Sequence, residues 1–138
     1  MKAIQPTPEQ ASAFMARDED ASIVMVNLLK FKDKASYAEG TAEYGEDISG
    51  AEAYRRYGVE VAGILSDIGA TPIITGIQPN FMIGDGEWDV VALVRYPSRA
   101  AMISMTQSAE YQAIHHHREA GLAHQELIEI TELPTSIL

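Results

Sequence analysis

The segment Trp88–Leu127 constrains the fold more than any other part of the chain. It opens with Trp88–Tyr96, an apolar run that is typical of a buried β-strand. Pro97 ends this run, and Ser98 is a favourable cap for a helix through about residue 105. Ser108 then precedes a second short helical stretch. The segment therefore predicts a strand followed by two short helices before the chain returns.

Turn and cap signals place the remaining elements. Capping boxes at Thr7–Gln10 and Ser49–Glu52 predict a short N-terminal helix and a longer helix that ends near Ile68. Gly84–Glu87 predicts a hairpin turn, and the polar segment 33–47 predicts a surface loop, with a lid as one interpretation. Three further strands are indicated by β-rich apolar runs: Ile23–Lys32, Thr71–Ile83 and His124–Leu133.

The resulting order, β-α-β-β-α-β after an N-terminal helix, is the ferredoxin-like α+β pattern. In this pattern an antiparallel sheet has its helices on one face. We expect a single α+β domain over residues 1–138, with a core over about 22–132 and the added helix over about 7–17. That helix is expected to bury Ala11, Phe14 and Met15.

Composition excludes several classes of function. Twenty acidic and ten basic residues give a net charge of −10, which disfavours binding to nucleic acid or to an anionic membrane. The chain has no cysteine, so disulfides, thiolate nucleophiles and cysteine-based metal centres are excluded. The N-terminus lacks the apolar region of a secretion signal, and no run approaches the ~18 apolar residues of a membrane span. We therefore expect a cytoplasmic protein.

Several short motifs, taken in order, resemble a family of small bacterial proteins known as domain of unknown function 1330. They are the strand Met25–Phe31, the helix that carries Tyr54, the strand end Val94–Arg99, the cap Ser108–Gln112 and, after it, Arg118. The resemblance covers about residues 22–132 and implies the dimeric α+β barrel superfamily. It further implies two ferredoxin-like sheets packed face to face, with a pocket in each subunit between sheet and helices.

A physical argument independently predicts a homodimer. Both faces of Ile23–Lys32 and of Trp88–Tyr96 carry bulky apolar side chains. Helices can cover only one face of a single sheet, and a large apolar patch left exposed usually marks an interface. We therefore expect self-association through the uncovered sheet face.

Asn27 and Arg95 are polar residues within apolar strands, where burial without a partner is costly. In the functional interpretation, Asn27 orients a ligand and Arg95 binds a carbonyl or carboxylate at a pocket mouth. In the structural one, Asn27 forms a hydrogen bond in the dimer interface, and Arg95 forms an ion pair with Glu126 or Glu129.

Two tyrosines, Tyr54 and Tyr57, lie at helical spacing and are expected to face the sheet, either as a pocket wall or as ordinary core. Tyr111 and Arg118 are seven residues apart and can share a helix face. Their favoured interpretation is structural, with Tyr111 packed on the sheet and Arg118 paired with Glu110 or Glu119, two acidic side chains of the same helix.

The adjacent histidines His115–His117 do not have the spacing of a metal site. Neighbouring helical residues point about 100° apart, whereas helical ligand pairs need i, i+3 or i, i+4 spacing. We therefore expect no metal ion and no other cofactor. A histidine has a pKa near neutrality, so one of the three, with His117 as the candidate, is a suitable general base.

These residues favour a homodimer that binds a small apolar or carbonyl-bearing molecule between sheet and helices. It would act as a cofactor-free monooxygenase-like or isomerase-like enzyme, in which Arg95 holds the carbonyl, a tyrosine donates a hydrogen bond and His117 moves the proton. The alternative is a non-catalytic ligand-binding or structural dimer. A heme-handling protein is less favoured: Asn27, Trp88 and a histidine are present, but Trp88 and the histidines are too far apart in sequence.

Overall fold

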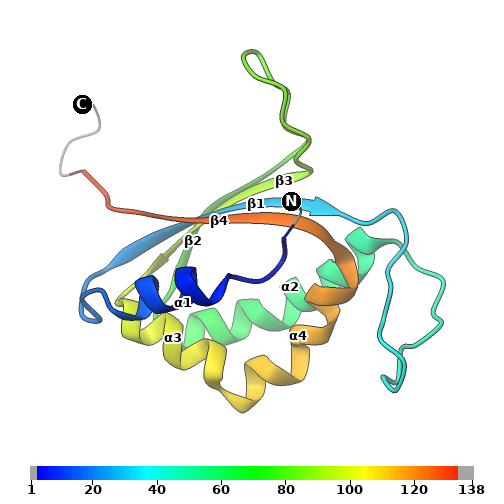
Figure 1. Cartoon of the computed structure of the whole chain (residues 1–138), viewed down its shortest axis with the longest axis horizontal. Coiled ribbons are helices and arrows are strands. Elements are labelled where there is room, and N and C mark those ends of the chain that lie inside the picture. The colour runs from blue at the N-terminus through cyan, green and yellow to red at the C-terminus, as the bar shows by residue number, and fades with distance from the viewer. Residues whose placement is uncertain (1–2, 134–138) are drawn as a thin grey trace.

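A computed structural model describes residues 3–133 of the chain. Figure 1 shows a curved sheet with the helices gathered beneath it. The elements are, in chain order, α1 (Pro8–Met15), β1 (Ile23–Phe31), α2 (Gly50–Asp67), β2 (Thr71–Ile77), β3 (Val90–Tyr96), α3 (Arg99–Gln107), α4 (Ala109–Gly121) and β4 (Leu122–Ile130).

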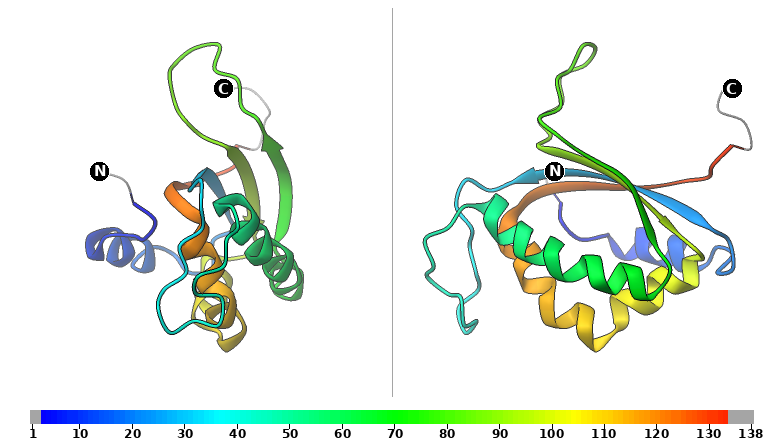
Figure 2. Two further views of the ribbon diagram at one scale, coloured as in Figure 1. Left: turned by 90° about the vertical axis from the view of Figure 1, so that its right-hand side faces the viewer. Right: turned by 180° about the vertical axis from the view of Figure 1, so that it is seen from behind.

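The sheet has the order β2-β3-β1-β4, and all three adjacent pairs are antiparallel. β1 is therefore a central strand, as its apolar sequence predicts. Figures 1 and 2 show the helices on one face of the sheet. This arrangement confirms the predicted ferredoxin-like α+β fold with an added N-terminal helix. No helix in the described part of the chain has the length and apolarity needed to cross a membrane.

The helices begin where their caps predict. Thr7 and Gln10 form a reciprocal capping box at α1, and serine hydroxyls accept backbone N–H bonds at the starts of the other three helices. A cap of this kind typically contributes ~1 kcal/mol. The box at Ser49 is only half formed, because the Glu52 carboxylate accepts two hydrogen bonds from Arg55 instead.

The segment between β2 and β3 corrects a sequence prediction. β2 ends at Ile77, well before Ile83, and residues 84–87 do not form a tight hairpin turn. Gln78 adopts a positive φ of 55°, and Pro79 has no N–H to donate, so the pairing with β3 stops there. Residues 78–89 instead form a long arm, named here the β2–β3 arm, which rises from the sheet away from the helices (Figures 1 and 2).

The core lies between the sheet and the helices. Its largest buried cluster comprises Ile23, Met25, Tyr57, Leu65, Ala70, Tyr96, Met105 and Tyr111. In α1, Phe14 packs against this cluster as predicted, but Met15 is 55% exposed, which corrects the expectation that it is buried. This short helix presents only a narrow face to the core, and Met15 lies outside that face.

Two glycines allow three elements to meet at one end of the sheet. Gly50 opens α2 and Gly121 ends α4, and a Cβ atom on either would collide with the backbone of the other segment. Lys32 follows β1; its N–H donates to the Gly121 carbonyl at 2.8 Å, and its carbonyl accepts from the Gly50 N–H at 3.1 Å. The end of β1 is therefore joined to both helices through backbone alone.

We expect Gly50→Ala to destabilise the fold by about 1–3 kcal/mol, because the new methyl group must displace the backbone of Lys32 and Gly121. Urea unfolding followed by circular dichroism measures the effect. Gly58→Ala is the matched control, since a Cβ there meets nothing within 4 Å and alanine favours helix by about 0.5–1 kcal/mol. Equal stability of the two variants would contradict the close crossing.

Candidate functional site

Arg95 lies on the sheet face opposite the helices. Its guanidinium forms a two-pronged ion pair with Glu132, with Nε–Oε1 at 2.6 Å and Nη2–Oε2 at 3.0 Å. The ion pair raises the pKa of Arg95 and lowers the pKa of Glu132. An ion pair with a glutamate is present, as the structural interpretation predicts, but the partner is Glu132 and neither Glu126 nor Glu129. The register pairs Val24 with both Arg95 and Ile130, which brings Glu132 to the diagonal position on that face.

The other predicted partner, Glu129, lies on the helix side of β4. It pairs with the buried Arg99 at 2.6 Å and with Arg17 at 2.5 Å. Arg99 also stacks over the ring of Phe14. These contacts of Arg17, Arg99 and Glu129 hold the end of α1 and the start of α3 against β4, so their role is structural.

Asn27 takes part in a polar network on the helix side of the sheet. Its amide nitrogen donates to the carbonyls of Met25 and Ala92, and its Oδ1 accepts from Gln125 at 3.1 Å. Gln125 also accepts a hydrogen bond from Arg118. The hydrogen bonds of Asn27 are thus made within its own chain.

Arg118 is the buried arginine at the end of this network, with 9% of its surface exposed. Its Nη2 also donates to the Ile4 carbonyl at 2.8 Å. Within residues 3–133, its Nη1 is the one buried side-chain polar atom without a hydrogen-bond partner. The predicted pairing of Arg118 with Glu110 or Glu119 is wrong, because burial turns its side chain towards β4 and the N-terminal segment.

Tyr54 and Tyr57 belong to an aromatic row that crosses the core. Ring centroids lie 5.2 Å apart from Phe31 to Tyr54, 5.2 Å from Tyr54 to Tyr57 and 5.9 Å from Tyr57 to Tyr111. The hydroxyls of Tyr57 and Tyr111 are hydrogen-bonded at 2.9 Å. Burial raises the pKa of Tyr54 to about 12 and raises the pKa of Tyr57 as well, so both hydroxyls are protonated at neutral pH.

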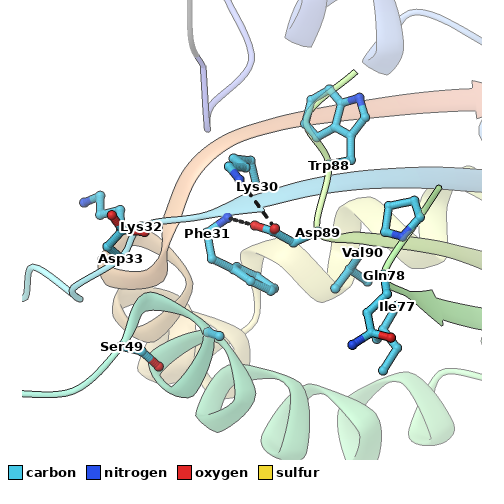
Figure 3. Close-up of a pocket in the computed structure, with 12 residues that line it drawn as sticks. Lys30, Phe31, Lys32, Asp33, Ser49, Ile77, Gln78, Trp88, Asp89 and Val90 are labelled. Carbon is cyan, nitrogen blue, oxygen red and sulfur yellow. Dashed lines mark hydrogen bonds and ion pairs between the residues drawn. The ribbon is translucent and has the colours of Figure 1, made fainter. Parts of the chain in front are cut away.

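The Phe31 end of this row reaches a cleft of about 640 Å³ at one end of the sheet. Figure 3 shows Phe31 on the helix side of β1 and Trp88 on the other side of the strand. Asp89 lies between β3 and β1 and accepts the Phe31 N–H at 2.8 Å and the Lys30 ammonium at 3.4 Å. The side chains that line the cleft include Lys30, Phe31, Ile77, Trp88 and Val90.

None of the five sequence-predicted site residues lines this cleft. Tyr54 comes nearest, because it packs behind Phe31. The sequence carries only a weak signal for the cleft itself, because Phe31 and Asp89 are recognised as strand ends only once β1 and β3 are known. Their meeting depends on the antiparallel pairing of β1 with β3, which sequence position does not reveal.

His117 lies away from the cleft, against the loop 33–47. Its Nδ1 is 2.7 Å from the Tyr37 hydroxyl, while its neighbour His116 places Nε2 3.2 Å from a carboxylate oxygen of Glu43. Burial and the neighbouring His116 lower the pKa of His117. Burial opposes the charged form of Glu43, but the hydrogen bond from His116 and the charges of both histidines lower its pKa overall.

The loop 33–47 is tied to the helices. The Ala35 N–H donates to the Ile48 carbonyl at 2.9 Å, and the Ser36 N–H donates to the Ala120 carbonyl at 3.0 Å. Tyr37 is only 6% exposed and packs against alanines of α2 and α4. In the described part of the chain, Glu43, His116 and His117 are the one group with three His or acidic ligand atoms within 4.8 Å of one another. Packing of the loop against α4 therefore brings Glu43 to the two histidines.

The fold and these sites define a ferredoxin-like α+β protein with a cleft at the sheet end. The model of the family described as Domain of unknown function (DUF1330) matches residues 43–131. The chain belongs to this family, as the sequence resemblance predicts. No match was found among curated proteins.

Solved structures of similar fold include a relative at 30% identity. A protein of unknown function from Rhodopseudomonas palustris is 30% identical, with a TM-score of 0.86 over 98% of this chain and 100% of that one. A DABB family protein with a ferredoxin-like fold from Mesorhizobium loti is 17% identical, with a TM-score of 0.52 over 81% and 97% of the two chains.

A third similar structure is a dimeric protein of unknown function with a ferredoxin-like fold from Bacteroides fragilis. It is 9% identical, with a TM-score of 0.51 over 79% of this chain and 94% of that one. At such identities, the Mesorhizobium and Bacteroides structures speak for the fold alone.

Proposed function

We propose that the protein is a homodimer that pairs the uncovered faces of two sheets and binds a small apolar or carbonyl-bearing molecule in the cleft at the sheet end. The observation that carries the dimer is the apolar character of the sheet face opposite the helices, named here the open face. Its cross-strand neighbours are Val26 and Leu28 of β1, Leu93 of β3, Ile74 of β2, and Ile128 and Ile130 of β4.

Several of these side chains are largely exposed in the single chain. Ile74 is 60% exposed, and Ile128 and Ile130 are each at least 40% exposed. Burying apolar surface gains about 25 cal/mol per Å², so exposed apolar side chains on a sheet face favour a partner of the same kind. A second copy supplies an identical, self-complementary face. The Bacteroides protein of the same fold is described as dimeric, which supports self-association.

The β2–β3 arm supports the same proposal. It rises on the side of the open face (Figure 1), and Met82 and Ile83 near its tip are each 94% exposed. At its base, Trp88 stacks on His124 with ring centroids 5.0 Å apart. An arm fixed at its base and apolar at its tip is suited to contact a partner sheet. In the dimer, Arg95 and Glu132 would belong to the interface, and Arg95 would not hold a ligand.

The cleft supports the binding of a small molecule. Phe31, Ile77, Trp88 and Val90 give it apolar walls, as ligand pockets commonly have. Lys30 is held only loosely by Asp89, at 3.4 Å, so its ammonium is available to donate to a carbonyl or carboxylate. His117 does not line the cleft. The proposal is therefore one of binding, without an assigned reaction.

We expect Ile74→Glu to weaken the dimer at least 100-fold, because each dimer would bury two carboxylates against apolar side chains. Size-exclusion chromatography with light scattering measures the mass across a dilution series. Val59→Glu, a similarly exposed position on α2, is the control and should leave the dimer intact. If both variants retain the mass of the unmodified protein, the open face is not the interface.

For the cleft, acetophenone is a suitable probe, because it combines an apolar ring with a carbonyl. We expect it to shift the NMR signals of the indole of Trp88, the only tryptophan, and of the Phe31 and Val90 amides. Ile77→Glu should weaken this binding at least tenfold by placing a charge in the apolar wall, whereas Val59→Glu should not. Shifts that arise elsewhere, or that survive Ile77→Glu, would remove the cleft from the proposal.

A further inference from the structure

The loop 33–47 and α4 bring together three side chains that no part of the proposed function uses. They are Glu43 of the loop and the adjacent His116 and His117 of α4. The two imidazole rings lie side by side, with centroids 4.0 Å apart, and both approach the Glu43 carboxylate. This group shares no residue with the cleft.

The spacing of the group suits a divalent transition-metal ion. His116 Nε2 is 3.2 Å from Glu43 Oε1, and His117 Nε2 is 3.9 Å from Glu43 Oε2. A tetrahedral ion with bonds of about 2.1 Å holds its ligand atoms roughly 3.4 Å apart. A single oxygen, Glu43 Oε2, lies 3.3 Å from His116 Nε2 and 3.9 Å from His117 Nε2, and these separations bracket that value.

Adjacent helical residues would not meet at one point by their spacing alone. Their directions differ by about 100°, and an ordinary helical pair of ligands is three or four residues apart. Here the third ligand approaches from the loop and lies within reach of both rings. The side chains of His117, Glu43 and His116 are 15%, 23% and 33% exposed, so an ion could enter from solvent.

His117 is oriented in the manner of a metal ligand. The Tyr37 hydroxyl engages its Nδ1 at 2.7 Å and leaves Nε2 directed at Glu43. Ligating histidines typically use their second ring nitrogen in such a bond, which fixes both the tautomer and the ring orientation. Tyr37 is itself held in place by burial against Ala53 and Ala120.

The charge of Arg56 disfavours a cation at His117, but a two-pronged ion pair with Glu46, at 2.8 and 3.3 Å, offsets it. The site itself combines one carboxylate with two imidazoles, a nitrogen and oxygen donor set suited to ions such as Zn²⁺.

We propose that Glu43, His116 and His117 bind one first-row divalent metal ion per chain, with zinc as the reference ion and Tyr37 as a positioning residue for His117. The ion would replace the hydrogen bond between His116 and Glu43. Three protein ligands leave a fourth position for water, as in zinc sites that are open to a substrate.

The test is a Zn²⁺ titration of the full chain, freed of any histidine tag, by calorimetry and by competition with a chromophoric chelator. Co²⁺ absorption reports the coordination geometry. We expect one ion per chain. Glu43→Gln and His116→Ala should each weaken binding at least 100-fold, and Tyr37→Phe should weaken it about 10–100-fold, because its hydroxyl is lost while its ring remains.

His115→Ala is the matched control, since this neighbour pairs with Glu119 and does not face the loop. It should bind zinc as the unmodified chain does. Circular dichroism and urea unfolding show whether each variant is folded. The proposal is overturned if the unmodified chain binds no zinc, if it binds half an ion per chain, or if folded Glu43→Gln binds as tightly as His115→Ala.

Discussion

The structure depends on one constraint: β1 is apolar on both faces, yet the helices cover only one of them. On the helix side, Ile23 and Met25 of β1 enter the core beside Tyr57 and Tyr96. On the other side, Val26 lies between Leu93 of β3 and Ile128 of β4, and Leu28 pairs with Val91 of β3. The apolar side chains of one face are therefore buried within the chain, and the proposed dimer would bury those of the other face.

The second organising feature is the glycine crossing at the end of β1. Gly50 and Gly121 let the start of α2 and the end of α4 approach the backbone of Lys32. The cleft opens beside this junction, between the start of α2 and the base of the β2–β3 arm. The loop 33–47 leaves from the same junction and returns along α4. Both candidate sites therefore depend on contacts made by loops and helix ends, which lie outside the core between the sheet and the helices.

Local chemistry made much of the fold predictable. Caps at Thr7, Ser49, Ser98 and Ser108 mark the helix starts, and apolar runs mark the strands, because both signals act over a few residues. The sites were less predictable. The Arg95–Glu132 pair follows from the register of the strands, and the contact of Glu43 with the histidines follows from the path of a loop. Neither contact can be predicted from the spacing of these residues in the sequence. The sequence does not predict the length of the β2–β3 arm, because the residues of Gly84–Glu87 are typical of a tight turn but do not form one.

We propose that a second copy covers the open face, and sedimentation equilibrium of the unmodified chain over a wide range of concentrations is the direct test. We expect a species of twice the chain mass that dissociates only on dilution. A single-chain mass at the highest soluble concentration would contradict it, because the exposed isoleucines of β2 and β4 would then remain in water.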